Sequence, residues 1–294
     1  MVDQPEIPIL KSINIYNGCF SKSLNLPELV AYLQAVIPGV AVHLHEEFIH
    51  CHATLDAQND ERNPVRTLAE TFAGIKVIDP RQRKRMTPPL PGEIEYEKRR
   101  LLNTARQPWG ILYDAEKLLD IYNELLPPED KGMHVLHLAV TNQLFGTWDT
   151  GDLRYHARTS MYGIPCIIST TGLVEAPAKA RTYYQSRQMG LSYETLEDHF
   201  QGEFLVHDDR RLTEVMKGYV MQAVFYCLGG DPFCSDPNCR LYNAHWQHEL
   251  LHAQLNAPYE LCPLHTAMLK IVRAYVHLHF LLFFAIMRDS VLNL

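Results

Sequence analysis

Two short pairs of metal-binding side chains lie near the end of the chain. Cys234 and Cys239 have the spacing CxxxxC in a stretch rich in Pro, Asp and Asn, and Cys262 and His265 follow with the spacing CxxH. Zinc prefers four soft sulfur or nitrogen ligands in a tetrahedron, and a loop and a helix start can each supply two. Three cysteines and one histidine leave no coordination position open for water. The four residues therefore predict a structural Zn²⁺ site.

A second motif, HELLH, runs from His248 to His252. On a helix, two histidines four residues apart share a face and can bind one zinc ion, with Glu249 between them as general base. The usual third ligand is missing, because Leu255 and Pro258 stand where a glycine and a histidine are needed. His248, Glu249 and His252 are catalytic candidates beside the alternative that the match is a coincidence.

Charged and imidazole side chains gather in residues 147–160, between two expected strands. A loop of this composition can recognise an anionic group or supply an acid–base pair, and it can equally be a salt-bridged turn. Residues 172–181 add charges that can line the same cleft. The candidate ligand-binding residues are Asp149, Asp152, Arg154, His156 and Arg158.

The elements that must position these residues alternate between strands and helices. Strands are expected at 13–17, 39–45, 74–79, 110–114, 134–141 and within 159–173, helices at 26–36 and 115–127, and an exposed loop or irregular lid at 81–100. From residue 212 onward the pattern is helical, apart from the Cys-rich loop. This order predicts an α/β or α+β fold in a single domain, 1–294, whose part 212–294 is helical and stapled by zinc.

The bulk composition excludes some classes of function. The 294 residues carry a net charge of −7 with acids and bases interspersed, which argues against a nucleic-acid surface. Seven cysteines, without a visible secretory signal, favour a reducing compartment, and we expect the cytoplasm.

An apolar run lies near the end of the sequence. Residues 275–287 are too few to span a bilayer, which takes about 20 residues. We expect this run to form a buried C-terminal helix or an oligomer contact rather than a membrane anchor.

A longer pattern resembles the archaemetzincins. It consists of HLAVTNQLFGTWD, RYHARTSMYGIPCIISTTGLVEAPAKAR, KGYVMQAVFYCLGGDPFCSDPNC and CPLH, and it covers residues 134–270. The chain resembles most an archaemetzincin-like group labelled only as metallopeptidases of unknown function. The resemblance implies a metzincin-like mixed sheet with helices.

The ligands that the family pattern uses for its structural zinc have counterparts in this chain. Archaemetzincins have an HExxHxxGxxH zinc helix, then a CxxxxC and a later CxxC, and these cysteines hold a second, structural zinc. Cys234 and Cys239 match the CxxxxC, and Cys262 matches the first cysteine of the later pair. His265 stands in place of the last cysteine, a replacement that zinc accepts.

The residues that the family pattern uses for its catalytic zinc are not present at the corresponding positions. Ala223, Val224, Cys227 and Phe233 stand where the family has His, Glu, His and His, and Gly230 alone matches. Three imidazoles position and acidify the attacking water, so their loss removes the mechanism.

The resemblance therefore implies a metallopeptidase-like protein with a structural zinc and without the usual catalytic one. Two alternatives remain open: a non-catalytic, zinc-stabilised binding or scaffold module, and an active zinc hydrolase that uses HELLH. The expected partner is a peptide or a protein.

Overall fold

The computed structural model describes residues 10–53, 64–103 and 108–274. The apolar run 275–287, with its predicted burial or oligomer contact, lies outside these residues. No helix within the three described ranges has the combination of length and apolarity that crossing a membrane requires.

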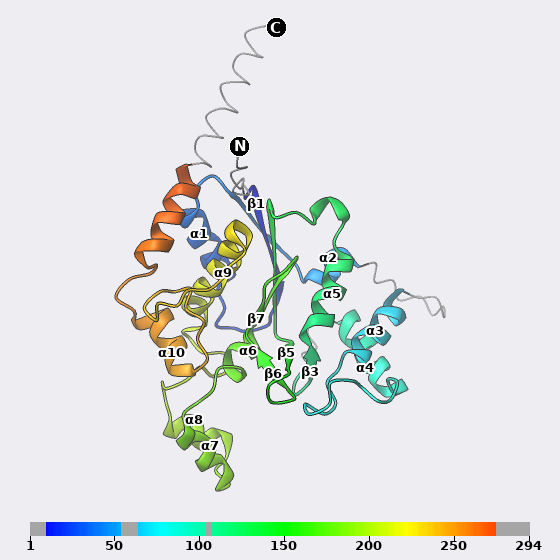
Figure 1. Ribbon diagram of the computed structural model, residues 1–294. Helices are drawn as coiled ribbons and strands as arrows, with labels where there is room; N and C mark the ends of the chain where they lie inside the picture. The colour runs from blue at the N-terminus through cyan, green and yellow to red at the C-terminus, as the bar shows by residue number, and fades with distance from the viewer. Residues whose placement is uncertain (1–9, 54–63, 104–107, 275–294) are drawn as a thin grey trace, which may run out of the picture.

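A five-stranded sheet forms the centre of the structure (Figure 1). Its strands are β1 (Ser12–Gly18), β2 (Ala41–His45), β4 (Val135–Thr141), β7 (Ser160–Met161) and β8 (Cys166–Ser169). The order is β2-β1-β4-β8-β7, in which β7 runs antiparallel to β8 and the other neighbours are parallel. This mixed sheet, with its helices, confirms the predicted fold class.

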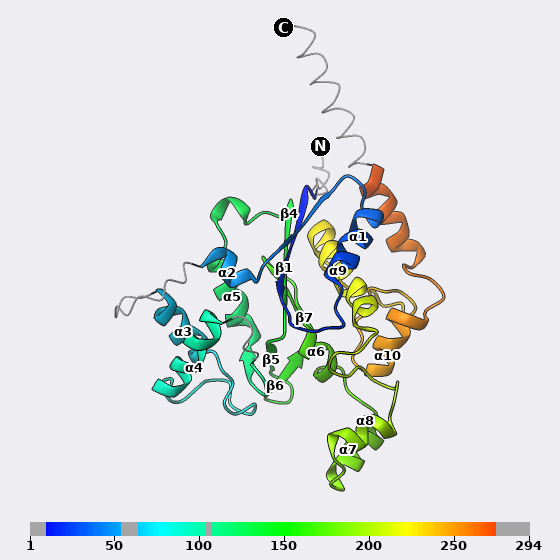
Figure 2. The ribbon, with the colours of Figure 1, turned by 180° about the vertical axis from the view of Figure 1, so that it is seen from behind.

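Helices cover both faces of the sheet (Figures 1 and 2). On one face lie α1 (Leu26–Val36) and α9 (Leu212–Gly229), and on the other lie α2 (Phe48–His52) and α5 (Ala115–Leu125). Ile15 of β1 packs with the first pair and the adjacent Tyr16 with the second, because successive side chains of a strand point to opposite faces.

A smaller sheet lies beside α5. It contains β3 (Leu112–Asp114), β5 (Leu144–Asp149) and β6 (Arg154–Arg158) in the order β3-β5-β6, and β5 and β6 form an antiparallel hairpin. The remaining helical segments are α3 (Pro64–Gly74), α4 (Pro91–Leu102), a 3-10 turn (Pro128–Asp130), α6 (Thr170–Glu175), α7 (Arg181–Gln188), α8 (Tyr193–His199), α10 (Gln247–Leu251), a π-helical turn (His252–Asn256) and a helix over 263–274.

Local sequence signals explain several of these boundaries. The Asn25 side chain accepts a hydrogen bond from the Glu28 amide, and Pro27 lies in the first turn, so α1 begins where the sequence predicts. Gly230 ends α9 in the left-handed conformation, with φ of 77°, as glycine does after many helices. The strands predicted at 13–17 and 134–141 are confirmed, as is the helical character from residue 212.

Two predicted strands differ from the structure. The segment 74–79 contributes only an isolated antiparallel bridge, Lys76 to Tyr113, and its first residue, Gly74, is the last residue of α3. The strand at 39–45 exists as β2 but begins at Ala41, and it is mostly exposed, since it is an edge strand paired only with β1. The region 159–173 contains β7 and β8 and then turns into α6, whose first turn is capped by the Ser169 hydroxyl.

The segment 81–100 is only partly the exposed loop that its charges predict, because its second half is α4. Pro91 occupies the first turn of this helix, and the Glu93 carboxylate accepts a hydrogen bond from the Leu90 amide (2.7 Å). The charged composition of this segment predicts an exposed loop, whereas the structure has a helix that buries ionised side chains.

Glu97 of α4 is the centre of this buried charge cluster. Its carboxylate contacts Lys76 Nζ (2.6 Å) and Arg100 Nε (2.7 Å) and accepts a hydrogen bond from the Tyr113 hydroxyl (2.9 Å). The Glu97 side chain has no exposed surface, so its charge is balanced by these two cations instead of by water.

We therefore predict that Glu97→Gln lowers the free energy of unfolding by about 3–5 kcal/mol, because it leaves two buried cations without their anion. Urea denaturation followed by circular dichroism measures this change. Glu95→Gln on the same helix is the control, since the Glu95–Arg99 pair is largely exposed and its loss should leave the transition in place. Equal effects of the two variants would contradict the prediction.

Candidate metal centre and adjoining cleft

The structure brings together the four side chains of the predicted zinc site, here called the Cys–His cluster (Cys234, Cys239, Cys262 and His265). Their ligand atoms all lie within 4.8 Å of one another. His265 Nδ1 lies 3.0 Å from Cys262 Sγ and 3.8 Å from Cys239 Sγ, and the Sγ atoms of Cys234 and Cys262 are 3.9 Å apart. Ligands of a tetrahedral zinc ion are separated by about 3.5–3.8 Å, so the donor set fits a zinc ion closely.

Backbone groups hold the cysteines of the cluster in place. The Asp236 amide donates to Cys234 Sγ and the Cys262 amide donates to Cys239 Sγ, both at 3.4 Å. The Asp236 carboxylate accepts from the Asn238 amide (3.0 Å) and from the Tyr259 hydroxyl, which closes the turn between the first two cysteines. Amide donors of this kind stabilise thiolate ligands.

Burial keeps the metal-free cluster uncharged. It raises the pKa of Cys239 to about 12 and also raises the pKa of Cys234, while it lowers the pKa of His265. At pH 7 these two thiols carry protons and this imidazole is neutral. A bound cation must therefore displace thiol protons, which couples metal binding to pH.

The HELLH residues do not converge in the structure. The Glu249 carboxylate accepts hydrogen bonds from the amides of His245 (2.8 Å) and Trp246 (3.0 Å) and so caps the start of α10. His252 Nε2 donates to the side-chain oxygen of Asn238 (2.8 Å), and His248 lines a separate cavity of about 270 Å³. Within the described ranges, the groups whose ligand atoms meet include none of His248, Glu249 and His252.

The helix α9 occupies the place of the zinc helix in the resemblance, and its chemistry differs accordingly. Ala223 and Val224 have no exposed surface, and Cys227 is 3% exposed, so all three lie in the main core. Ala223 and Val224 have no side-chain atom that could bind a metal ion or take a proton from water. Cys227 contacts Cys166 of β8, and this hydrogen bond lowers the pKa of Cys227.

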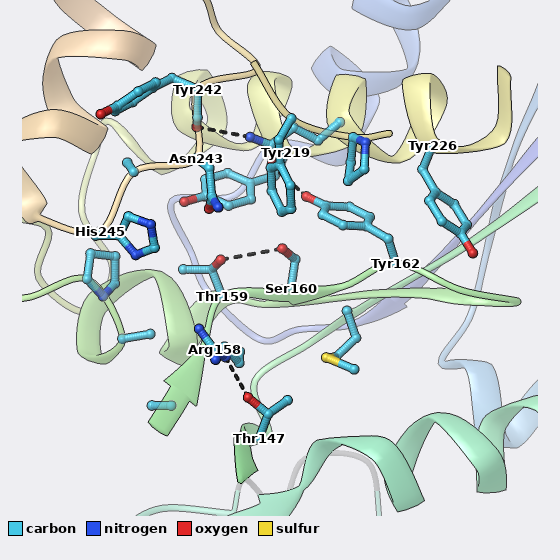
Figure 3. Close-up of a pocket in the computed structure, with 18 residues that line it drawn as sticks. Thr147, Arg158, Thr159, Ser160, Tyr162, Tyr219, Tyr226, Tyr242, Asn243 and His245 are labelled. Atoms are coloured by element: carbon cyan, nitrogen blue, oxygen red, sulfur yellow. Dashed lines mark hydrogen bonds between the residues drawn. The ribbon is translucent and has the colours of Figure 1, made fainter. Parts of the chain in front are cut away.

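A different strip of α9 faces a cleft of about 460 Å³ (Figure 3). Tyr219, Gln222 and Tyr226 form this strip, with the i, i+3, i+7 spacing of one helix face. The opposite wall is the edge strand β7 with its flanking residues, and the loop after α9 closes the cleft. The residues that line it are Thr147, Ala157, Arg158, Thr159, Ser160, Met161, Tyr162, Ala176, Pro177, Tyr219, Gln222, Tyr226, Pro232, Phe233, Tyr242, Asn243, Ala244 and His245.

Gln222 joins three walls of the cleft. Its side-chain oxygen accepts a hydrogen bond from the Tyr162 hydroxyl (2.5 Å), and its amide nitrogen donates to the Tyr242 carbonyl (3.2 Å). Gln222 is 1% exposed, and burial raises the pKa of Tyr162 well above its ordinary value. The Tyr162 hydroxyl and the Gln222 side-chain oxygen therefore depend on each other for a hydrogen-bond partner. The sequence predictions do not include this strip; the i, i+3, i+7 spacing of its three polar side chains is the signal that could have indicated it.

The charged residues of 147–160 lie on a β-hairpin, not on a loop. His156 Nε2 lies 2.8 Å from Asp152 Oδ2, and Arg154 Nε lies 2.7 Å from the same oxygen. The His156 hydrogen bond, followed by that of Arg154, lowers the pKa of Asp152. Asp149, Asp152 and His156 also bring ligand atoms within 4.8 Å of one another, but both carboxylates are exposed, and exposed acidic groups are common without a metal.

The two arginines of this hairpin have different surroundings. Arg154 is exposed and paired with Asp152, whereas Arg158 is half-buried and lines the cleft. Of the residues 172–181, Ala176 and Pro177 line the cleft. The charges expected there lie elsewhere: Lys179 is buried beside the ring of Tyr183, where desolvation lowers its pKa.

A protein family and a solved structure are similar to this chain. The model of a family described as "Probable metallopeptidase family (DUF6775)" matches residues 10–272. No curated protein matches the chain. Among solved structures, the chain is similar to the crystal structure of archaemetzincin from Methanopyrus kandleri, with 13% sequence identity and a TM-score of 0.40, over 91% of this chain and 97% of that one.

The raised pKa values of Cys234 and Cys239 predict the pH dependence of metal binding. Since both thiols are protonated below their raised pKa values, zinc must displace at least these two protons, and its affinity should fall by at least about 100-fold for each unit of pH decrease near neutrality. Competition with a chromophoric chelator between pH 6 and 8 (roughly the stable range) measures this slope. An affinity independent of pH would show that these thiols are not ligands.

Proposed function

The chain belongs to this probable metallopeptidase family, and from that premise we propose that it is a zinc-containing, metallopeptidase-like protein without the usual catalytic zinc. In this proposal the Cys–His cluster holds one structural zinc ion. The observation that carries it is the convergence of four soft ligand atoms within 4.8 Å. Three sulfurs and one nitrogen saturate tetrahedral zinc, so the bound ion would supply cross-linking and not an activated water.

The surroundings of α9 support the second half of the proposal. The positions where the resemblance expects zinc ligands and a general base hold buried Ala223, Val224 and Cys227. The HELLH alternative has weaker support, because the Glu249 carboxylate already accepts two backbone amides and the His252 imidazole already bonds Asn238. A general base needs a free lone pair directed at a bound water.

The cleft favours the candidate function of a binding module. It is concave, lies against the edge strand β7, and has a volume within the range of ligand sites, which is about 300–1,000 Å³. An edge strand offers backbone donors and acceptors to an extended chain. The proposed partner is therefore a peptide or an extended segment of a protein.

Two further points complete the proposal. We place the chain in the cytoplasm, because a reducing compartment keeps thiols available to zinc.

We also treat residues 1–294 as one domain whose helical part begins at 212, since the main core joins Leu10 to Val272 in a single cluster of buried side chains.

Zinc content per chain tests this function. After dialysis against a weak chelator, elemental analysis should find one zinc ion in the wild-type protein and none in Cys262→Ser, which should also lose thermal stability. Cys51→Ser is the control, because Cys51 is an exposed cysteine outside the cluster, and it should retain the ion.

The competing hydrolase predicts a different result. It requires two zinc ions, one of which survives Cys262→Ser, and a peptidase activity that Glu249→Gln abolishes. Glutamine keeps an oxygen that can cap α10, so the variant removes the base while it preserves the helix start. That pair of results would overturn the proposed function.

A further inference from the structure

The cleft has a cationic side and an aromatic side (Figure 3). Arg158 lies near Thr147 at one edge, while the rings of Tyr162 and Tyr226 lie toward α9. The ring of Phe233, in the loop after α9, contacts that of Tyr162. We propose that the cleft binds the C-terminal residue of a peptide, with its carboxylate on Arg158 and an apolar or aromatic side chain against the three rings. The inference rests on the ligand-binding role proposed above and names the ligand.

Arg158 is held in place but is not neutralised. Its Nε donates to Thr147 Oγ1 (2.7 Å), which fixes the guanidinium on β6. In the described part of the chain, no carboxylate lies within salt-bridge distance of Arg158, whereas its neighbour Arg154 is paired with Asp152. A guanidinium has five N–H donors in a planar fork, so the two terminal nitrogens of Arg158 are available to both oxygens of a carboxylate.

The charge of the cleft selects an anion. Among the residues that the structure describes, those that line the cleft include no Asp, Glu or Lys, and Arg158 is their one arginine. A half-buried charge without a partner is unfavourable, and an incoming carboxylate removes this cost. The hydroxyls of Thr159 and Ser160, which follow Arg158 in sequence, lie 3.4 Å apart between Arg158 and the ring of Tyr162.

The aromatic side is fixed before any ligand arrives. The ring of Tyr162 lies edge-on to Phe233, with centroids 5.7 Å apart, and 6.1 Å from the ring of Tyr226. The bond from Tyr162 to Gln222 holds the central ring, and Phe233 remains 37% exposed at the rim. A preformed, partly exposed group of rings gains stability by burying an apolar side chain.

The position of the edge strand indicates that the bound carboxylate is the C-terminus of a peptide. β7 pairs with β8 on one side, and its other edge borders the cleft. An extended chain can pair with this edge, and Arg158, the last residue of β6, precedes β7 by two residues with a bend at Thr159 between them. The carboxylate of such a chain would then reach the guanidinium while the last side chain reaches the rings.

Fluorescence anisotropy with the zinc-loaded, full-length protein tests the proposal. The probe is a short peptide labelled at its N-terminus and ending in Phe, prepared once as the free acid and once as the amide. We expect the free acid to bind at least about tenfold more tightly, because a carboxylate–guanidinium pair is a charge-assisted bond. Arg158→Gln should remove this preference, whereas the matched control Arg154→Gln should keep it.

A second pair of measurements tests the aromatic side. Tyr226→Ala should weaken the peptide ending in Phe more than one ending in Gly, while both keep their preference for the free acid. N-acetyl-phenylalanine as competitor shows whether the last residue alone is sufficient.

The outcomes separate the two proposals. Equal binding of acid and amide, unchanged in Arg158→Gln, would overturn carboxylate recognition and leave the binding role of the cleft intact. No binding of either peptide to a protein that holds its zinc would overturn both. Zinc content and melting temperature, measured on each variant, exclude misfolding as the cause.

Discussion

The burial of α9 is the constraint on which the rest of the structure depends. Of its 18 residues, 14 are buried, so the helix needs cover on nearly every side. The sheet and α1 cover part of it, and the segments after it cover much of the remainder. The first of these segments, residues 231–246, contains no helix or strand. In the proposed function, a metal ion bound by Cys234, Cys239, Cys262 and His265 would cross-link this segment and hold it against α9.

The features that could be predicted from the sequence are those fixed by local chemistry. The helix α1 follows from a capping Asn25 and a proline in the first turn, and both signals lie within three residues of its start. The Cys–His cluster follows from two short spacings, because zinc restricts which residue types and separations can serve it. In each case the deciding interaction joins residues that are close in sequence, so no knowledge of the fold was needed.

The features that could not be predicted depend on partners far away in the chain. The helix α4 looks like a charged loop because its buried Glu97 is stable only beside Lys76, Arg100 and Tyr113. The cleft is assembled from β6, β7, α9 and the loop after α9, and its central residue is a glutamine with no diagnostic chemistry. The HELLH motif shows the opposite case. Its spacing is typical of a zinc site, but in the structure its glutamate caps a helix.

The metal cluster and the cleft share one segment of chain, and this connects stability to function. Phe233 of the cleft precedes the ligand Cys234, and the Cys234 amide donates to the Leu241 carbonyl (2.9 Å), beside Tyr242, whose carbonyl bonds Gln222. A zinc ion that fixes this loop therefore fixes one wall of the cleft. By thermodynamic linkage, any ligand that needs the wall in this arrangement must strengthen zinc binding by the same factor by which zinc strengthens the ligand. A closed metal site with no chemistry of its own can thus control what the cleft binds.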